Sequence, residues 1–218
     1  MRITRIEPQK NRPDRSNIYA DGKFIAGVSR ETLLRLALRT GDEIGVDVVK
    51  ALEQTEEILS AKNAALRFLS IRPRTIREVR DKLREKEFAD GEISRAIQDL
   101  VDTGLLNDTE FARMYLRDAL TIRPAGKMLL RRKLLLLGVD KTTVDECLEE
   151  AFRDVDQVQE IRKIGEQFLR RSRATKKSAE DPLKLRNRLT GFLLRRGYAW
   201  DAIEPALKTL LKKRDDSE

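Results

Sequence analysis

Histidine is absent from the 218 residues of this chain, and cysteine occurs once, as Cys147. Without histidine, the sequence excludes a histidine general base, a histidine-containing catalytic triad and histidine-ligated metal sites. A single cysteine can neither close an intrachain disulfide nor build a zinc site. The sequence therefore predicts a protein that is not an enzyme and that needs no metal and no cofactor.

Long apolar runs are also absent. The longest uninterrupted run of leucines is Leu134 to Leu137, whereas a membrane-spanning helix needs about 18 apolar residues. The N-terminal residues, MRITRIEPQK, contain no apolar segment typical of a secretion signal. Together with the single cysteine, these features predict a protein of the reducing cytoplasm.

Aromatic residues make up only 5% of the chain, whereas charged residues make up 38% and the formal net charge is +8. Because both signs of charge alternate with periodic apolar residues, we expect folded helices rather than a disordered chain. The positive excess predicts an anionic partner, which is DNA, RNA or an acidic groove on a protein, and a membrane fits least well. With few aromatic residues among the basic ones, stacking on unpaired bases is not indicated.

What the chain does contain is an internal repeat. Ile71-Arg72-Pro73 recurs 51 positions later as Ile122-Arg123-Pro124. Repeats of this length are typical of stacked helical units. In the same register we expect equivalent core residues: Val79, Leu83, Phe88, Ile93 and Ile97 in the first repeat; Leu130, Leu134, Val139, Val144 and Leu148 in the second; and, after a further shift of 59, Leu189, Leu193, Tyr198, Ile203 and Leu207 in the third.

The predicted fold is mainly all-α, with three tandem three-helix repeats in an elongated curved array. A small N-terminal β-hairpin with a short helix precedes them. The expected divisions are residues 1–45 for this N-terminal region, 46–62 for a linking helix, and 63–107, 108–156 and 157–214 for the repeats, with a basic loop at about 173–181 in the third.

Local signals define the N-terminal region. Asp21-Gly22 between strand-forming residues predicts a β-hairpin turn. The polar stretch at 9–15 predicts an exposed loop, which is either solvated or in contact with phosphate. Ser29 is a suitable N-cap for the short helix.

Helix boundaries in the repeats follow from proline and capping residues. Pro73 is expected to close a helix over 64–71, because the residue before a proline avoids the α region. Thr75 and Glu78 form the capping-box pattern of the next helix. Asp108 is the expected N-cap of the first helix in the second repeat.

Two residues with chemical potential have simpler interpretations. The repeat register aligns Cys147 with Ala96 and Ala206, which predicts a small core residue rather than a reactive thiol. Gly126-Lys127 lacks the upstream glycine and the following Ser or Thr of a phosphate-binding loop, so nucleotide binding is not predicted.

Positive charge is concentrated in two parts of the chain. Residues 63–88 contain eight basic and four acidic residues and residues 159–196 contain twelve and four, whereas residues 140–160 contain two and eight. Single basic side chains commonly just solvate a helix, but their clustering favours an anion-binding surface. The candidates are Arg72, Arg74, Arg77, Arg80, Arg84, Lys127, Arg131, Arg132, Lys184, Arg186, Arg188, Arg195 and Arg196.

Several strings in the chain resemble the RecX family. They include Ala65-Leu66-Arg67-Phe68-Leu69, Arg74-Thr75 followed by Glu78-Val79 and Lys82-Leu83, Gly104-Leu105-Leu106-Asn107-Asp108 followed by Phe111-Ala112 and Tyr115, then Gly126 and Gly138-Val139. The resemblance covers residues 60 to 155 well and the third repeat more loosely. The N-terminal hairpin region is similar to an extension seen in some members.

This resemblance implies a function. Members of the family are bacterial regulators of the RecA recombinase, built from tandem three-helix repeats. A protein of this kind is expected to be a monomer that binds in the groove of a RecA filament on single-stranded DNA. There it restrains ATP hydrolysis, strand exchange and filament growth. No individual contact residue follows from a motif, so the basic candidates depend on charge alone.

Two other functions stay open on the sequence. One is a stand-alone helical protein that binds DNA or RNA. Tight binding to free nucleic acid that weakens steeply with salt would identify it. The other is a scaffold protein that uses apolar seams between repeats. An exposed apolar face would indicate such a protein.

Overall fold

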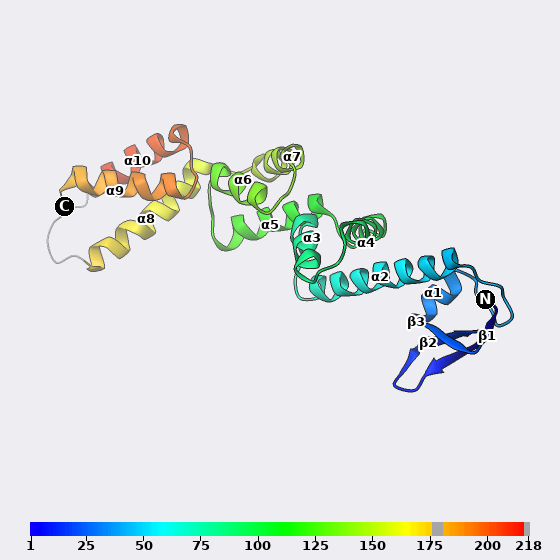
Figure 1. The fold of residues 1–218 in the computed structure, drawn as a ribbon. Helices are drawn as coiled ribbons and strands as arrows, with labels where there is room; N and C mark the ends of the chain where they lie inside the picture. Colours follow the sequence, from blue (N-terminus) through cyan, green and yellow to red (C-terminus); the bar gives the residue numbers. More distant parts are fainter. Residues whose placement is uncertain (176–180, 216–218) are drawn as a thin grey trace. The chain divides into compact units, whose positions relative to one another are not determined.

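The computed structural model describes residues 1–175 and 181–215. Within these residues the chain forms three β-strands followed by ten α-helices (Figure 1). The chain divides into two compact units, Met1–Leu106 and Asn107–Glu218. The prediction of a mainly helical protein with three-helix repeats behind a small β-structure is confirmed.

The N-terminal strands form one antiparallel sheet in the order β1 (Ile3–Gln9), β2 (Arg12–Ala20) and β3 (Lys23–Ser29). The predicted hairpin turn at Asp21-Gly22 is confirmed. Both residues have positive φ, 48° and 76°, which a tight two-residue hairpin turn requires.

The polar stretch at 9–15 is not a loop, so that prediction is wrong. Gln9 pairs with Arg12 across a tight turn, and the two strands continue on either side. Polar side chains do not prevent pairing, because backbone hydrogen bonds hold an antiparallel ladder together. Gln9 Nε2 also donates to Asn17 Oδ1 at 2.8 Å. Arg15 forms an ion pair with Glu56, 3.0 Å from Nη2 to Oε2, and so contributes to the fold.

A partly buried polar cluster attaches the sheet to the helices. Ser29 caps α1 (Arg30–Arg35) as predicted, because its hydroxyl accepts a hydrogen bond from the backbone N–H of Thr32. Glu56 accepts hydrogen bonds from the Ser29 N–H, at 2.7 Å, and from the Thr32 hydroxyl. One carboxylate thus connects the last strand and the first helix.

The helix that carries Glu56, α2 (Val46–Leu69), extends from the sheet to the first repeat. Near its start Leu52 is buried against the sheet core, and near its end Ala61 and Ala64 are buried in the core of the repeat. The expected linking helix at 46–62 and repeat helix at 64–71 are parts of this one helix, because no glycine or proline interrupts it.

Each repeat packs three helices around a core of its own. The helices are the end of α2, α3 (Ile76–Glu85) and α4 (Asp90–Asp102) in the first; α5 (Asp108–Ile122), α6 (Lys127–Leu136) and α7 (Lys141–Phe152) in the second; and α8 (Gln157–Thr175), α9 (Pro182–Arg195) and α10 (Trp200–Asp215) in the third. Every predicted core residue of the repeat register is buried, except that Phe88 is partly buried. Cys147, Ala96 and Ala206 are buried at equivalent positions, as predicted.

Two predicted boundaries need comment. The N-cap of α5 is Asn107 rather than Asp108, because Asn107 Oδ1 accepts hydrogen bonds from the N–H groups of Thr109 and Glu110, at 2.9 and 3.1 Å. The predicted basic loop at about 173–181 lies largely on residues 176–180, which are outside the described ones. Its first residues belong to α8, which continues to Thr175.

The turn after each middle helix has the same construction in all three repeats. One residue with positive φ follows the helix: Glu87 at 64°, Gly138 at 92° and Gly197 at 81°. The next N–H then donates to a carbonyl of the helix, from Phe88 to Leu83, Val139 to Leu134 and Tyr198 to Leu193, at 3.3, 3.2 and 3.3 Å. This is the Schellman motif, and it brings an apolar side chain back onto the helix that it follows.

A close backbone contact joins the second and third repeats, which belong to the same unit. The N–H of Gly126 donates to Arg196 O at 2.9 Å, and the N–H of Met128 donates to Gly197 O at 3.2 Å. A Cβ on Gly126 would lie 2.1 Å from Gly197 O, and a Cβ on Gly197 would lie 2.3 Å from Leu129 N. This glycine seam therefore needs both glycines.

Glu87→Gly is expected to stabilise the first unit by about 0.5–1 kcal/mol, because a non-glycine residue at positive φ is strained. Its side chain is exposed and forms no ion pair within the described residues, so little else changes. Denaturant unfolding measures the effect. Unchanged or lower stability would show that the residue does not have this conformation in solution.

Leu83→Ala and Leu134→Ala are each expected to lower the free energy of unfolding by roughly 2–5 kcal/mol through the cavity left in the core. Leu136→Ala is the matched control, because Leu136 is exposed on the same helix as Leu134. We expect it to change stability by no more than about 0.5 kcal/mol. Equal effects of Leu134→Ala and Leu136→Ala would contradict the repeat register.

Gly126→Ala is expected to separate the second and third repeats at the glycine seam, since the new methyl group overlaps backbone atoms. We expect a destabilisation of about 1–3 kcal/mol and faster hydrogen exchange of the Met128 amide. Gly91→Ala is the control, because a Cβ there meets no atom within 4 Å. Protection of the Met128 amide in Gly126→Ala would argue against the seam.

Candidate functional site

Two of the candidate arginines are engaged with a carboxylate beside the start of α3. Thr75 and Glu78 form the predicted capping box. Glu78 Oε1 also accepts from Arg72 Nη2 at 2.6 Å and from Arg74 Nη1 at 3.4 Å, and the Arg74 guanidinium lies 4.1 Å from the ring centroid of Phe68. Arg72 and Arg74 therefore stabilise the turn that precedes α3.

The pKa of Glu78 reflects these contacts. Partial burial raises the pKa, but hydrogen bonds from Arg72 and from the Thr75 N–H outweigh that effect and hold the pKa below its usual range. The carboxylate therefore stays charged, and the two arginines keep their partner at neutral pH.

The other three candidates of the first repeat lie along α3 and have weaker contacts. Arg77 Nε lies 3.9 Å from Asp81 Oδ2, and Arg84 Nε lies 3.0 Å from Asp90 Oδ1. Arg80 donates to Ser94 Oγ at 3.4 Å. Exposed pairs of this kind contribute about 0–1 kcal/mol, so a partner anion can replace them at little cost.

In the second repeat, two of the three candidates contact the protein itself. Arg131 makes a two-pronged ion pair with Asp145, with distances of 2.7 and 3.1 Å, and its hydrogen bonds lower the pKa of that carboxyl. Lys127 Nζ lies 5.3 Å from the ring centroid of Phe152. Arg132 is exposed, and no carboxylate within the described residues pairs with it.

In the third repeat, the candidates divide in the same way. Arg188 lies over the ring of Phe168, at 5.3 Å. Arg196 lies over the ring of Phe192, at 4.9 Å, and donates to Pro124 O in the second repeat at 3.1 Å. In the part of the chain that the structure describes, three exposed cations form no ion pair or hydrogen bond through their side chains: Lys184, Arg186 and Arg195.

The structure thus sorts the thirteen candidates by availability. Arg72, Arg74, Arg131 and Arg196 stabilise turns or helix contacts, and Lys127 and Arg188 lie over aromatic rings. Arg77, Arg80 and Arg84 form exposed contacts that are easily exchanged. The most available cations are Arg132, Lys184, Arg186 and Arg195, and all four lie on the middle helices of the second and third repeats.

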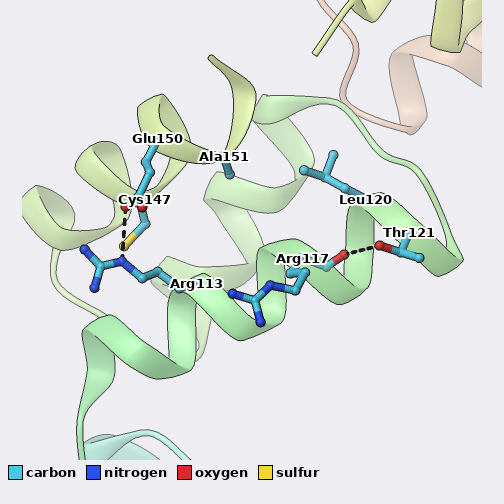
Figure 2. Close-up of a pocket in the computed structure, with 7 residues that line it drawn as sticks. All are labelled: Arg113, Arg117, Leu120, Thr121, Cys147, Glu150 and Ala151. Atoms are coloured by element: carbon cyan, nitrogen blue, oxygen red, sulfur yellow. Dashed lines mark hydrogen bonds and ion pairs between the residues drawn. The ribbon is translucent and has the colours of Figure 1, made fainter. Parts of the chain in front are cut away.

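The sequence does not predict a pocket of about 390 Å³ between α5 and α7. Figure 2 shows Arg113 on α5 reaching Glu150 on α7, at 3.1 Å from Nε to Oε2. Arg117 lies one turn further along α5, and Leu120 and Ala151 supply apolar lining. The i, i+4 spacing of Arg113 and Arg117 places both on one side of α5, but only the structure shows that α7 lies opposite them.

Cys147 also lines this pocket, and its environment is that of a structural residue. Burial raises the pKa of its thiol, which disfavours the nucleophilic thiolate. Among the described residues, no group of three or more acidic or cysteine side chains is placed to hold a metal ion. In the same residues, no helix has the length and apolar character needed to cross a membrane.

The chain matches four descriptions of one protein family along its length. Residues 1–45 match the regulatory protein RecX N-terminal domain, and residues 61–100, 107–148 and 156–207 match the first, second and third RecX three-helix domains.

Individual relatives give the same result. The regulatory protein RecX of Bacillus velezensis is 34% identical over 214 residues, which cover 98% of this chain and 79% of that protein. Its counterpart in Clostridium acetobutylicum is 29% identical over 214 residues, 98% of each chain.

Two solved structures are similar in fold. A crystal structure of a regulatory protein RecX matches with a TM-score of 0.80 and 23% identity, over 93% of this chain and 97% of that one. The structure of RecX from Lactobacillus salivarius matches with a TM-score of 0.62 and 26% identity, over 72% and 97%. Four successive RecX domains match this chain, and one RecX protein is 34% identical over 98% of it. This chain therefore belongs to the RecX family of regulatory proteins.

Proposed function

We propose that this chain is a non-enzymatic regulator of a RecA-type recombinase. It binds in the groove of the RecA filament on single-stranded DNA and restrains ATP hydrolysis, strand exchange and filament growth. It acts as a monomer in the cytoplasm and needs no cofactor. The observation that carries this proposal is membership of the RecX family over all four domains, from residue 1 to residue 207.

The distribution of charge supports a partner that has both phosphate and protein surface. Arg77, Arg80 and Arg84 form one cationic face on α3 with only weak internal pairs. The acidic residues 140–160 partly neutralise neighbouring arginines, as Asp145 does for Arg131. A filament groove contains DNA phosphates beside charged protein surface, so it suits a chain with separate basic and acidic zones.

The alternative is a stand-alone helical protein that binds DNA or RNA. The specific observation in its favour is the group of exposed cations on α9, Lys184, Arg186 and Arg195, which have no carboxylate partner among the described residues. Such residues attract any polyanion. The absence of an exposed aromatic platform on α9, where Phe192 packs 4.7 Å from Phe168 between ring centroids, is against base stacking.

The direct test is the DNA-dependent ATPase activity of RecA with and without this protein at micromolar concentration. We expect slower ATP hydrolysis and slower strand exchange, and the effect should depend on the molar ratio of the protein to RecA. Unchanged rates for both reactions would refute the proposal. A gel-shift series on free single-stranded DNA at several salt concentrations tests the alternative. For a stand-alone DNA-binding protein we expect tight binding without RecA. The logarithm of its binding constant should fall with the logarithm of the salt concentration, with a slope of about −0.7 per phosphate contact.

Arg77→Glu combined with Arg80→Glu is expected to weaken inhibition of RecA several-fold while leaving the fold intact, because both side chains make only peripheral contacts. The matched control is Lys23→Glu with Lys50→Glu, which changes the net charge equally at two exposed positions outside the basic clusters. The inhibition constant and circular dichroism measure the two effects. If both double variants lose inhibition equally, overall charge rather than the α3 face is responsible.

A further inference from the structure

The middle helix of the third repeat, α9, has two unlike faces. Leu185, Leu189 and Leu193 are buried toward the repeat. On the opposite side Leu183 and Leu194 are 66% and 49% exposed. Eleven residues apart on a helix, these two leucines lie within about 20° of each other around the axis, so they belong to one outward stripe.

The charged residues within this helix are all basic, although its N-cap is Asp181. From Pro182 to Arg195 the helix contains no aspartate or glutamate. Lys184 and Arg195 flank the stripe on one side and Arg186 on the other, by the helical period. None of the three forms an ion pair within the described residues. The face therefore combines exposed apolar surface with positive charge that no carboxylate among the described residues neutralises.

The backbone and core packing of the described residues does not require the glycine beside the stripe, Gly191. A Cβ on Gly191 would meet only the end of the Arg195 side chain, 3.3 Å away. By contrast, a Cβ on Gly165 would lie 2.4 Å from Leu210 Cδ1, so packing explains that glycine. A glycine inside a helix is less favourable than an alanine at the same position. Gly191 is half-buried and has no side chain, so the backbone of another molecule can approach closely there.

We propose that this face of α9, formed by Leu183, Gly191 and Leu194 with Lys184, Arg186 and Arg195, docks an acidic protein segment of the recombinase filament. Carboxylates of that segment pair with the three cations, its apolar side chains cover the two leucines, and its backbone passes over Gly191. The assignment rests on the proposed function and adds a location and a partner chemistry to it.

Charge and apolarity together favour a protein segment over nucleic acid. Covering leucine side chains is favourable because apolar surface is removed from water. Sugar and phosphate groups provide little apolar surface for that. The cations supply the electrostatic complement for carboxylates. An acidic segment with apolar residues satisfies both features of the face, whereas a phosphate backbone satisfies only the charge.

Gly191→Gln and the double variant Leu183→Ser with Leu194→Ser test this docking face in the full chain. Binding to RecA filaments assembled on single-stranded DNA is measured by titration, and thermal unfolding is measured in parallel. Gly191→Gln should keep or raise the melting temperature, because glutamine is a better helix former than glycine. We expect each variant to lose at least tenfold in affinity for the filament.

Leu136→Ser is the matched control, because this leucine is 69% exposed on the middle helix of the second repeat. We expect its affinity to equal that of the unmodified protein. If the α9 variants bind the filament as tightly as the unmodified protein does, the docking face is refuted and the proposed function stands. If the unmodified protein itself does not bind the filament, the proposed function fails, and the docking face with it.

A titration with free single-stranded DNA decides the chemistry of the partner. We expect Gly191→Gln to change affinity for free DNA less than twofold, because the glycine serves a protein backbone. An equal loss for free DNA and for the filament would overturn the assignment and make this face a nucleic-acid contact.

Discussion

The left-handed turn at the end of each middle helix is the constraint on which the three-helix units depend. At Glu87, Gly138 and Gly197 the backbone adopts positive φ, and the next residue returns its apolar side chain to the core. Without that reversal the third helix of each unit cannot pack over the first two. Two repeats supply glycine, which tolerates this conformation. The first repeat has Glu87 there, so the path of the backbone, rather than the type of side chain, determines the positive φ at this residue.

The same turn serves a second purpose in the third repeat. Gly197 ends α9 and also contacts the second repeat, where its carbonyl accepts the Met128 N–H. Arg196, beside it, donates to Pro124 O. The break between α5 and α6 therefore functions as an attachment point as well as a helix boundary. A basic residue that the sequence marks as a binding candidate is used here to hold two repeats together.

This use of basic residues changes how the net charge of +8 is understood. Much of the arginine content stabilises the protein itself through carboxylates, carbonyls and aromatic rings, as Arg72 and Arg74 do at Glu78. Among the candidates, the exposed cations without a side-chain ion pair or hydrogen bond in the described residues lie on the middle helices of the second and third repeats. Buried apolar residues occupy the other side of these helices, so each helix has a core face and an outward face with the cations that we propose for partner binding.

The sequence by itself determined the repeat, the core and the structural nature of Cys147, because apolar residues at helical spacing report burial directly. It also located the hairpin turn and the capping box of α3, which depend on neighbouring residues. Only the tertiary structure decided which arginines are available, since their partners are distant in the chain: Asp145 is 14 residues from Arg131, and Pro124 is 72 residues from Arg196. The polar strand residues at 9–15, the α5–α7 pocket and the glycine seam were likewise beyond the sequence, because each depends on backbone pairing or on surfaces from separate helices that no local pattern records.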